Sequence, residues 1–462
     1  MAAIFWWQMQ KLFNPKSIVL IGATGRQGSV GLGIAKNLLA GAGKRRKIFF
    51  VNPNSAKVLN RKTFVSIGDI KEKIDLAIIA VPSRFVEGVG QECCLAGVGA
   101  AVIISSGFAE TGVEGEKAQQ AISEMFARNN IPLVGPNCLG VINPSKGLNA
   151  SFAPETPQKG NIAFLSQSGA LVDSIIDKSL SENFGFSLMV SYGNEAGLSL
   201  NDFLKIADED KNTEVIVVYL EEIKNGREFM KIASGITGRK PIVILKGGKT
   251  REGKKAVQSH TASLAGDEKI YSAAFAQAGI VEAETIEDLF LIARTLSVYP
   301  KAAGPWAVLT NGGAVGVLTA DWCSKLGVGL AEIPQAVFDE IAKSEKVNAA
   351  FSRNNPLDII GDASSQGYEA ALWSLLGQKE ISGVIFCQTL QAMTDPFQNA
   401  EIIIEARKRF PEKPVLPLFL GGKTTKKGSD ALVKKGLFCF NEPRDAALAA
   451  RSLQGADIPV NY

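Results

Sequence analysis

The chain of 462 residues contains a single histidine, His260, in the segment AVQSHTASLAGD (256–267). An imidazole can act as a nucleophile or carry protons near neutral pH, so this residue is a candidate for covalent catalysis. Ser259 and Thr261 flank it and Ser263 follows. A lone histidine is also often an ordinary surface or packed residue, and that interpretation stays open on this segment alone.

Two later parts of the chain repeat each other, and the comparison bears on His260. Three pairs of segments match in the same order: 161–177 with 305–321, 213–221 with 381–389, and 240–250 with 413–424. After the shared GGKT, the first copy runs into the His260 segment, whereas the second continues as TKKGSDALVKKGLFCF without a histidine. A histidine that served only the fold would need an equivalent in the sister copy, so the difference favours chemistry at His260.

A carboxylate is available to support the histidine. Glu221 ends the apolar run TEVIVVYLE (213–221), at the strand edge where α/β proteins build their sites. There it would accept a hydrogen bond from one imidazole nitrogen and leave the other nitrogen nucleophilic. Glu222 is adjacent and is the alternative, since strand alternation lets only one of the two point inward.

Two strand-to-helix turns have the composition of phosphate-binding turns. SQSG (166–169) places Ser168 and Gly169 at a helix N-terminus, and TNGG (310–313) repeats the arrangement in the second copy. Backbone amides and the helix dipole favour an anion at such a position. Each turn could equally be an ordinary helix N-cap.

A third turn lies near the N-terminus. The strand SIVLIG (17–22) runs into GATGRQGSVG, which places Gly22, Gly25 and Gly28 where the chain enters a helix. Glycines let the backbone approach a diphosphate closely, so a nucleotide or coenzyme A (CoA) suits this turn. A tight turn without a ligand is the alternative.

The end of the next strand discriminates between nucleotides. Asn52 stands where an NAD site usually has an acid, and Lys57, Arg61 and Lys62 follow. Basic groups suit the extra ribose phosphate of CoA. NADP would fit the charge too, but no second histidine is present to act as an acid in hydride transfer. The basic cluster could also be a solvated helix face.

The elements that position these residues alternate between strand and helix. Apolar runs at 17–22, 47–52, 75–82 and 100–108 alternate with segments of helical composition, which predicts parallel sheets built of βα units. We expect domains at 1–145, 160–300 and 301–462, the last two being related doubly wound α/β domains, with a linker at 151–160. GGKTREGKKA (247–256) has the composition of an exposed loop able to carry His260 between sites.

Composition narrows the class of protein. The net charge of +4, from 50 basic and 46 acidic residues, is too balanced to announce a nucleic-acid binder. No run approaches the roughly 20 apolar residues of a membrane span. The opening MAAIFWWQMQKLF lacks the features of a secretory signal, and Phe5, Trp6 and Trp7 are expected to dock on this protein or on a partner. Six cysteines without a C-x-x-C pair indicate reduced thiols in a cytoplasmic protein and no metal site on this chain.

The combination of motifs resembles the NDP-forming acyl-CoA synthetases, in particular the α subunit of ADP-forming acetate–CoA ligase, a relative of succinyl-CoA synthetase. The resemblance covers nearly the whole chain. It rests on GATGRQGSVG, VNPN, AVPS, GPNCLG, SQSGAL, YLE, SHTASLAGD, TNGGAVGV and NNPLDIIG, which occur in the family's order. It implies a Rossmann-like CoA-binding domain followed by two flavodoxin-like domains.

The resemblance also implies roles for individual residues. His260 would carry a phosphoryl group from an acyl phosphate to ADP, with Glu221 steadying it. The family's phosphate-binding turns match Gln167, Ser168 and Gly169, and Asn311, Gly312 and Gly313. Thr24, Gly25, Gln27 and Ser29 would hold CoA, with Val51, Pro53, Lys57, Val81 and Pro82 lining its site. Residues for the acid pocket are expected near Ser106, Gly107 and Asn137.

One unit of the family has no counterpart here, the ATP-grasp domain that binds ADP and Mg2+. The resemblance therefore implies a β subunit that supplies this domain, in an α2β2 assembly. Two other classes remain as alternatives at this point: a non-catalytic CoA- or nucleotide-sensing protein on the same domains, and an NADP oxidoreductase.

Overall fold

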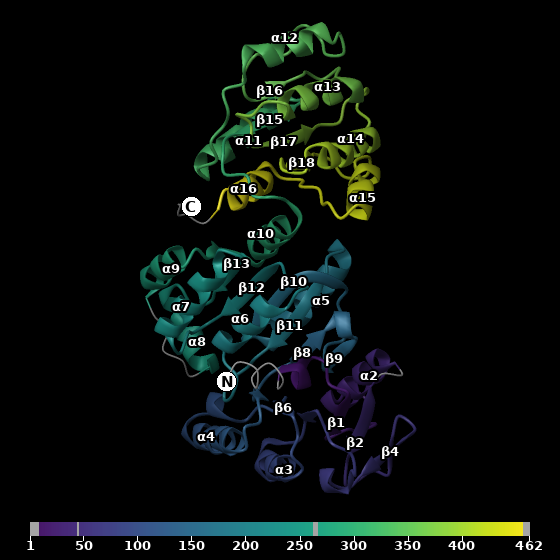
Figure 1. Cartoon of the computed structure of the whole chain (residues 1–462), viewed down its shortest axis with the longest axis vertical. Coiled ribbons are helices and arrows are strands. Elements are labelled where there is room, and N and C mark those ends of the chain that lie inside the picture. The colour runs from purple at the N-terminus through teal and green to yellow at the C-terminus, as the bar shows by residue number, and fades with distance from the viewer. Residues whose placement is uncertain (1–8, 44–45, 262–266, 456–462) are drawn as a thin grey trace. The chain divides into compact units, whose positions relative to one another are not determined.

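The computed structural model describes residues 9–43, 46–261 and 267–455, apart from the side chains of Ala42 and of residues 258–261. The chain forms two compact units, Met1–Glu284 and Thr285–Tyr462 (Figure 1). Phe5, Trp6 and Trp7 lie outside the described residues. Within the described ranges, no helix has the length and apolar character needed to cross a bilayer.

The first sheet of unit 1 has the strand order β3-β4-β2-β1-β5-β6-β7 and is parallel except for the β3–β4 pair. Each of the four apolar runs that we expected to be strands contains a strand, which confirms that part of the prediction. The strands are β1 (Ser17–Ile21), β2 (Lys47–Val51), β3 (Lys57–Val58), β4 (Arg61–Phe64), β5 (Leu76–Ile79), β6 (Ala100–Ile103) and β7 (Leu133–Val134); the helices are α2 (Val30–Ala42), α3 (Ser83–Leu95) and α4 (Val113–Arg128).

The order in which the strands are added to this sheet reverses at β1. β2 pairs with one side of β1 and β5 with the other, both in parallel. The carboxyl ends of β1 and β5 therefore flank a topological switch point, where open α/β sheets bind ligands. The glycine turn after β1 and the segment after β5 lie at this edge.

The second sheet of unit 1 has the order β14-β13-β12-β10-β11-β8-β9. One apolar core cluster contains residues of both sheets, including Leu20 and Leu165. The strands are β8 (Gly140–Asn143), β9 (Leu148–Ser151), β10 (Lys159–Ser166), β11 (Phe186–Ser191), β12 (Val215–Leu220), β13 (Ile242–Lys246) and β14 (Val281–Ala283); the helices are α5 (Gly169–Glu182), α6 (Leu200–Glu209), α7 (Gly226–Thr237), α8 (Arg251–Thr261) and α9 (Glu268–Gln277).

The β8–β9 hairpin joins this second sheet by antiparallel pairing with β11. The sequence pattern places residues 140–143 in the first domain and residue 151 at the start of a linker. The pairing of β8 with β11 places the hairpin in the second sheet. Local composition does not reveal this, because it does not show which sheet a short strand joins. The three domain bounds themselves stay a prediction.

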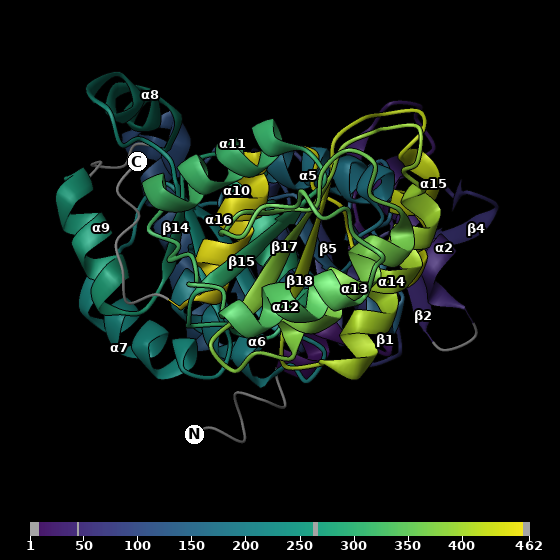
Figure 2. The same ribbon diagram turned by 90° about the horizontal axis from the view of Figure 1, so that it is seen from above.

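Unit 2 repeats the central strands of the second sheet. Its order β16-β15-β17-β18 corresponds to β11-β10-β12-β13, so the three matched segment pairs occupy equivalent places. Helices α11 and α16 cover one face and α12, α13 and α14 the other (Figure 2). The elements are β15 (Trp306–Thr310), β16 (Leu357–Asp358), β17 (Gly383–Gln388), β18 (Val415–Phe419), α10 (Ile286–Val298), α11 (Gly313–Lys325), α12 (Gln335–Lys343), α13 (Ser365–Leu376), α14 (Pro396–Arg409), α15 (Lys426–Lys434) and α16 (Pro443–Leu453).

The segment before His260 corrects one expectation. Residues 251–261 form helix α8 instead of a loop. The Gly253 N–H donates to Thr250 Oγ1 at 3.0 Å, which caps the helix. The loop expectation followed the glycines and lysines of 247–256 and gave too little weight to the helix-favouring run REGKKAVQ. The backbone of His260 lies in the last turn of α8, and its side chain lies outside the described residues.

Candidate functional site

A pocket of about 500 Å3 opens in unit 1 at the edge where the strands of the first sheet end. Its lining comes from the start of α2, from the segments after β5, β6 and β9, from the loop before β8, and from the turn that begins α5. It brings together seven of the predicted site residues: Val81, Pro82, Ser106, Asn137, Gln167, Ser168 and Gly169. Candidate CoA, acid and phosphate contacts thus share one cavity.

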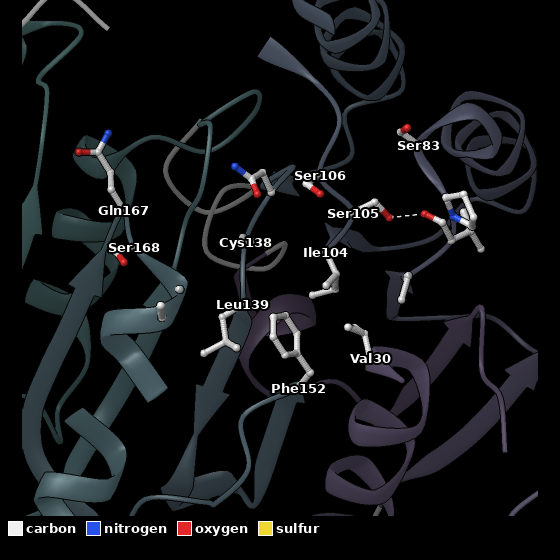
Figure 3. A pocket seen from close by; sticks show the side chains of 16 residues that line it. Val30, Ser83, Ile104, Ser105, Ser106, Cys138, Leu139, Phe152, Gln167 and Ser168 are labelled. Atoms are coloured by element: carbon white, nitrogen blue, oxygen red, sulfur yellow. Dashed lines mark hydrogen bonds between the residues drawn. The ribbon is translucent and has the colours of Figure 1, made fainter. Parts of the chain in front are cut away.

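The pocket has an apolar part and a polar part. Figure 3 shows Val30, Ile104, Leu139 and Phe152 gathered toward one end, with the side chains of Ser106 and Gln167 toward the other. The hydroxyl of Ser105 donates to the Val81 carbonyl at 2.5 Å. Such a mixture suits a ligand with a short hydrocarbon part and a charged or polar head.

Cys138 also lines this pocket, and its thiol is held in the protonated form. Burial raises the pKa of Cys138 to about 12, and Sγ donates to the Ile103 carbonyl at 3.3 Å. Because the thiolate is the reactive form of cysteine, Cys138 is not a nucleophile at neutral pH.

The turn at the start of α5 offers backbone amides to the pocket. Ser168 is the N-cap, with its Oγ accepting from the Leu171 N–H at 3.3 Å, and its own N–H donates to Ser166 Oγ at 3.1 Å. The next amides, of Gly169 and Ala170, belong to the first helical turn and have no intrahelical acceptor. Both residues line the pocket, so this wall is suited to an anion.

Gln167 connects this turn to the end of β12. Its Oε1 accepts the backbone N–H groups of Glu221 and, at 3.2 Å, of Glu222. The Gln167 N–H donates to the Tyr219 carbonyl at 3.2 Å. The phosphate-type turn and the candidate supporting carboxylates are therefore clamped to one another.

Glu221 is the more enclosed of the two carboxylates, with 5% of its surface exposed, while Glu222 is half-buried. Tyr219 Oη donates to Glu221 Oε1 at 3.3 Å. Burial, and next the charge of Glu221, raise the pKa of Tyr219 to about 12, so the phenol stays a donor. The pairing of Glu221 with His260 stays a prediction, because the imidazole lies outside the described residues.

Lys246 is a buried cation beside Glu221 that the sequence reasoning missed. It ends β13, pairs in register with Leu220, and is 5% exposed. A Cβ on the next residue, Gly247, would lie 3.6 Å from Glu221 Cγ. Burial lowers the pKa of Lys246, and the charges of Glu221 and Glu222 oppose this shift. The within-chain comparison could have revealed it, since the second copy has the apolar Phe419 at the equivalent place in the strand register.

The sister turn in unit 2 has the same clamp between turn and strand end. Asn311 Oδ1 accepts the Thr389 N–H at 2.8 Å, and Asn311 Nδ2 donates to the Thr389 carbonyl at 3.1 Å. Asn311 is 1% exposed, so its carboxamide holds the turn together. The Gly312 N–H donates to Thr310 Oγ1 at 3.0 Å, so a phosphate contact of this turn would use the amide of Gly313, where a Cβ would lie 3.1 Å from Asp358 Oδ2.

The glycine turn after β1 is exposed at Gly25–Gly28 and is available to a ligand. Ser29 caps α2 by accepting from the Leu32 N–H at 3.4 Å. Thr24, Gly25, Gln27 and Ser29 lie together in this turn. Asn52 Nδ2 donates to the Ala23 carbonyl at 2.7 Å, so the residue that replaces the acid of an NAD site holds the turn in shape.

The basic residues after β2 lie on a hairpin, and the helix-face alternative is wrong. β3 and β4 pair antiparallel, with Lys57 opposite Lys62 and Arg61 opposite Val58. Like charges directly opposite each other destabilise a strand pair. The three exposed cations would gain from a bound anion, which agrees with the expected CoA contact at Lys57. Pro53 is exposed nearby.

Two predicted contacts are placed differently from the rest. Val51 is 4% exposed and packs in the apolar core, so its side chain contributes little surface to a ligand site. Gly107 does not line the pocket. Its φ is +103°, and a Cβ at this position would lie 2.8 Å from Ser83 Oγ, so the turn itself requires the glycine.

Among the described residues, no group of three or more His, Cys, Asp or Glu is placed to hold a metal ion.

Three family models match consecutive parts of the chain. They are described as a CoA binding domain (residues 16–144), a succinyl-CoA ligase like flavodoxin domain (159–296) and a ligase-CoA domain (306–454). Over 454 residues the chain is 37% identical to the acetate–CoA ligase [ADP-forming] I subunit alpha of Pyrococcus furiosus, covering 96% of this chain and 97% of the relative. The chain belongs to the NDP-forming acyl-CoA synthetase family.

Further relatives and solved structures agree with this membership. The acetate–CoA ligase [ADP-forming] I of Archaeoglobus fulgidus is 40% identical over 442 residues, covering 96% of this chain, which spans 62% of that longer relative. The acetyl-coenzyme A synthetase 1 of Ca. Korarchaeum cryptofilum, solved in complex with phosphate and ADP, superposes with a TM-score of 0.91 at 36% identity, covering 96% of each chain. The expected Rossmann-like and flavodoxin-like fold is confirmed.

Proposed function

We propose that this chain is the α subunit of an ADP-forming acyl-CoA synthetase that interconverts acetyl-CoA, ADP and phosphate with acetate, ATP and CoA. The observation that carries the proposal is the single pocket in which the candidate CoA contacts Val81 and Pro82 meet the anion-binding turn Gln167–Gly169. That turn is clamped to Glu221 through Gln167, so thioester and phosphoryl chemistry share one site.

The first step forms an acyl phosphate. A phosphate oxygen held at the amides of Gly169 and Ala170 attacks the thioester carbonyl carbon, the C–S bond breaks, and CoA leaves as the thiolate, which takes up a proton. CoA is a substrate here, held by the turn Thr24–Ser29 and by Lys57. The apolar wall of Val30, Ile104, Leu139 and Phe152 keeps water from the carbonyl.

The second step moves the phosphoryl group to the protein. One imidazole nitrogen of His260 attacks phosphorus, the bond from phosphorus to the acyl oxygen breaks, and the acid leaves as its carboxylate. Glu221 accepts a hydrogen bond from the other nitrogen and stabilises the positive charge that forms on the ring. Lys246 offsets the charge of Glu221 in this enclosed place.

The third step needs a partner. We assign ADP binding, with its Mg2+, to an ATP-grasp β subunit in an α2β2 assembly. An oxygen of the ADP β-phosphate attacks phosphorus of the phosphohistidine, the P–N bond breaks, and ATP forms. The reduced cysteines fit a cytoplasmic enzyme.

The test is ATP formation from acetyl-CoA, ADP and phosphate by this chain together with a candidate β subunit. We expect ATP and free CoA in equal amounts, and none with either chain alone. Tight CoA binding by the chain, with no ATP formed under any combination, would contradict the proposal and point to a CoA sensor.

A further inference from the structure

A row of polar side chains runs from Glu110 to the pocket. Glu110 belongs to the short helix Ala109–Thr111. Its Oε1 accepts the N–H groups of Gly107 at 2.6 Å and Phe108 at 3.2 Å. Its Oε2 accepts from Asn194 Nδ2 at 2.6 Å. Glu110 does not line the pocket, so any effect on the ligand passes through its neighbours.

Asn194 can take only one orientation in this row. One Nδ2 hydrogen goes to Glu110, and the other goes to Gln119 Oε1 at 2.9 Å. Both acceptors require the amide nitrogen on their side, so Asn194 Oδ1 must face away from them. Asn137 lies on that side, and its Nδ2 donates to Asn194 Oδ1 at 3.2 Å.

The orientation of Asn137 follows from that of Asn194. Because Asn137 presents its nitrogen to Asn194, one Nδ2 hydrogen and the lone pairs of Oδ1 remain. Within the described part of the chain, no hydrogen bond takes up Asn137 Oδ1. Asn137 lines the pocket and has a φ of 57°, a left-handed conformation that asparagine tolerates.

The backbone around the row is held at both ends. A Cβ on Gly193 would lie 2.3 Å from the Pro136 carbonyl oxygen, so the segments 136–137 and 193–194 are in direct contact. Lys224 Nζ donates to the Asn194 carbonyl at 2.8 Å. The side-chain amides therefore have little freedom to shift. What can still change is which end of each carboxamide, oxygen or nitrogen, faces its neighbour.

We infer that Glu110 and Asn194 are positioning residues that fix which end of the Asn137 carboxamide faces the reacting groups in the pocket. The inference rests on the proposed function. In the fixed orientation Asn137 turns its Nδ2 to Asn194 and presents Oδ1 as an acceptor for the proton carried by the attacking phosphate. An acceptor in that place holds an unprotonated phosphate oxygen toward the thioester carbonyl carbon.

The charge on Glu110 persists at working pH. Partial burial acts to raise the pKa of Glu110, but hydrogen bonds from Gly107, Asn194 and Phe108 outweigh burial and leave the pKa below its ordinary value. The carboxylate is thus an acceptor throughout the neutral range, and the polarity of the row does not change there.

The test reverses the direction of the hydrogen bonds between residue 110 and Asn137 with one substitution and restores it with a second. In Glu110→Gln, the new amide donates toward Asn194, which must turn its oxygen toward residue 110 and its nitrogen toward Asn137. Asn137 then turns in response. Its N–H groups cannot accept the phosphate proton, so we expect kcat to fall on the order of tenfold to hundredfold, with the affinity for free CoA and the KM for ADP unchanged. Adding Asn194→Asp supplies an acceptor both to the new amide at position 110 and to Asn137, so the double variant should recover most of kcat.

Each comparison separates positioning from simple support of the fold. Asn194→Asp alone places two carboxylates in contact and should be worse than the double variant, although it changes one residue fewer. Wild-type kcat in Glu110→Gln, or a double variant no better than the poorer single variant, would overturn the inference. Wild-type protein that forms no ATP with its β subunit would instead overturn the proposed function.

Discussion

The side chain of Gln167 holds the backbone N–H groups of Glu221 and Glu222, and Asn311 holds that of Thr389 in the same way in unit 2. The duplicated halves thus share the clamp between turn and strand end. Glu221, Lys246 and His260 have no charged or imidazole counterpart in the second half, where Thr389 and Phe419 stand in place of the first two. The clamp therefore belongs to the fold of both halves, whereas the chemical roles that we propose fall on residues of unit 1 alone.

Gln167→Glu separates these two roles. A glutamate keeps the oxygen that accepts from Glu221, so the free energy of unfolding should change by less than about 1 kcal/mol. Its charge beside the amides of Gly169 and Ala170 opposes phosphate, and the KM for phosphate should rise at least about tenfold, as one lost charge-assisted contact of about 1.4 kcal/mol or more would give. Steady-state kinetics with varied phosphate would detect this. An unchanged KM would place phosphate elsewhere.

Asn311→Ala is the matched change in unit 2. It leaves the N–H and hydroxyl of the half-buried Thr389 without the Asn311 oxygen that accepts from both. Chemical denaturation should show a loss of about 1–3 kcal/mol. A loss of activity without any loss of stability would mean that Asn311 contacts phosphate directly, as the family resemblance implies.

Lys246→Met tests the buried cation. Methionine keeps an unbranched chain of similar length but leaves the enclosed carboxylate of Glu221 without the nearby cation, so the free energy of unfolding should fall by on the order of 3 kcal/mol. Phosphorylation of the chain should fall by at least about tenfold, because the charge of Glu221 is no longer offset. Lys255→Met, on the exposed side of the same region, is the control and should be silent. Full activity in Lys246→Met would reduce Lys246 to a packing residue.

The glycine turn offers a pair of substitutions with opposite consequences. Gly22 has a φ of +97°, and a Cβ there would lie 2.2 Å from the Ala80 carbonyl oxygen, so Gly22→Ala should prevent stable folding. A Cβ on Gly25 meets nothing within 4 Å, so Gly25→Ala should melt as the wild type does. If the turn holds the CoA diphosphate closely, Gly25→Ala should weaken CoA binding several-fold by calorimetry. Wild-type affinity would show that the ligand does not approach this glycine.

Asp173 gives a pH-dependent prediction. Burial raises the pKa of this α5 carboxyl to about 6 from an ordinary 3.8. A raised carboxyl pKa means that the folded protein prefers the protonated form, so stability is lost as the pH rises from about 4 to about 6. Asp173→Asn should therefore be more stable at pH 8 by about 1 kcal/mol, after allowance for solvent screening of a half-exposed group. At pH 3 the two proteins should be equally stable, and a constant difference at both pH values would assign the effect to packing.

The sequence predicts the strands and the turns well, because buried parallel strands are continuous apolar runs and glycine turns have fixed chemistry. It places seven residues that share the pocket, although they lie as far apart as Val81 and Gly169. It misses the β8–β9 hairpin and the row Glu110–Asn194–Asn137, since pairing across long sequence separations leaves no local pattern. The α8 helix is missed because glycines and lysines dominate the composition of a segment that contains a capped helix.

The most direct test of the account is phosphate labelling of His260. The chain is incubated with acetyl-CoA and labelled phosphate, and acid-labile phosphate is located by mass spectrometry, with His260→Ala and Glu221→Gln as variants. The account predicts labelling of His260 that requires acetyl-CoA, is lost in His260→Ala, is reduced in Glu221→Gln, and is discharged by ADP with a β subunit. Absence of labelling in a chain that binds CoA and forms ATP with its partner would contradict the phosphohistidine mechanism.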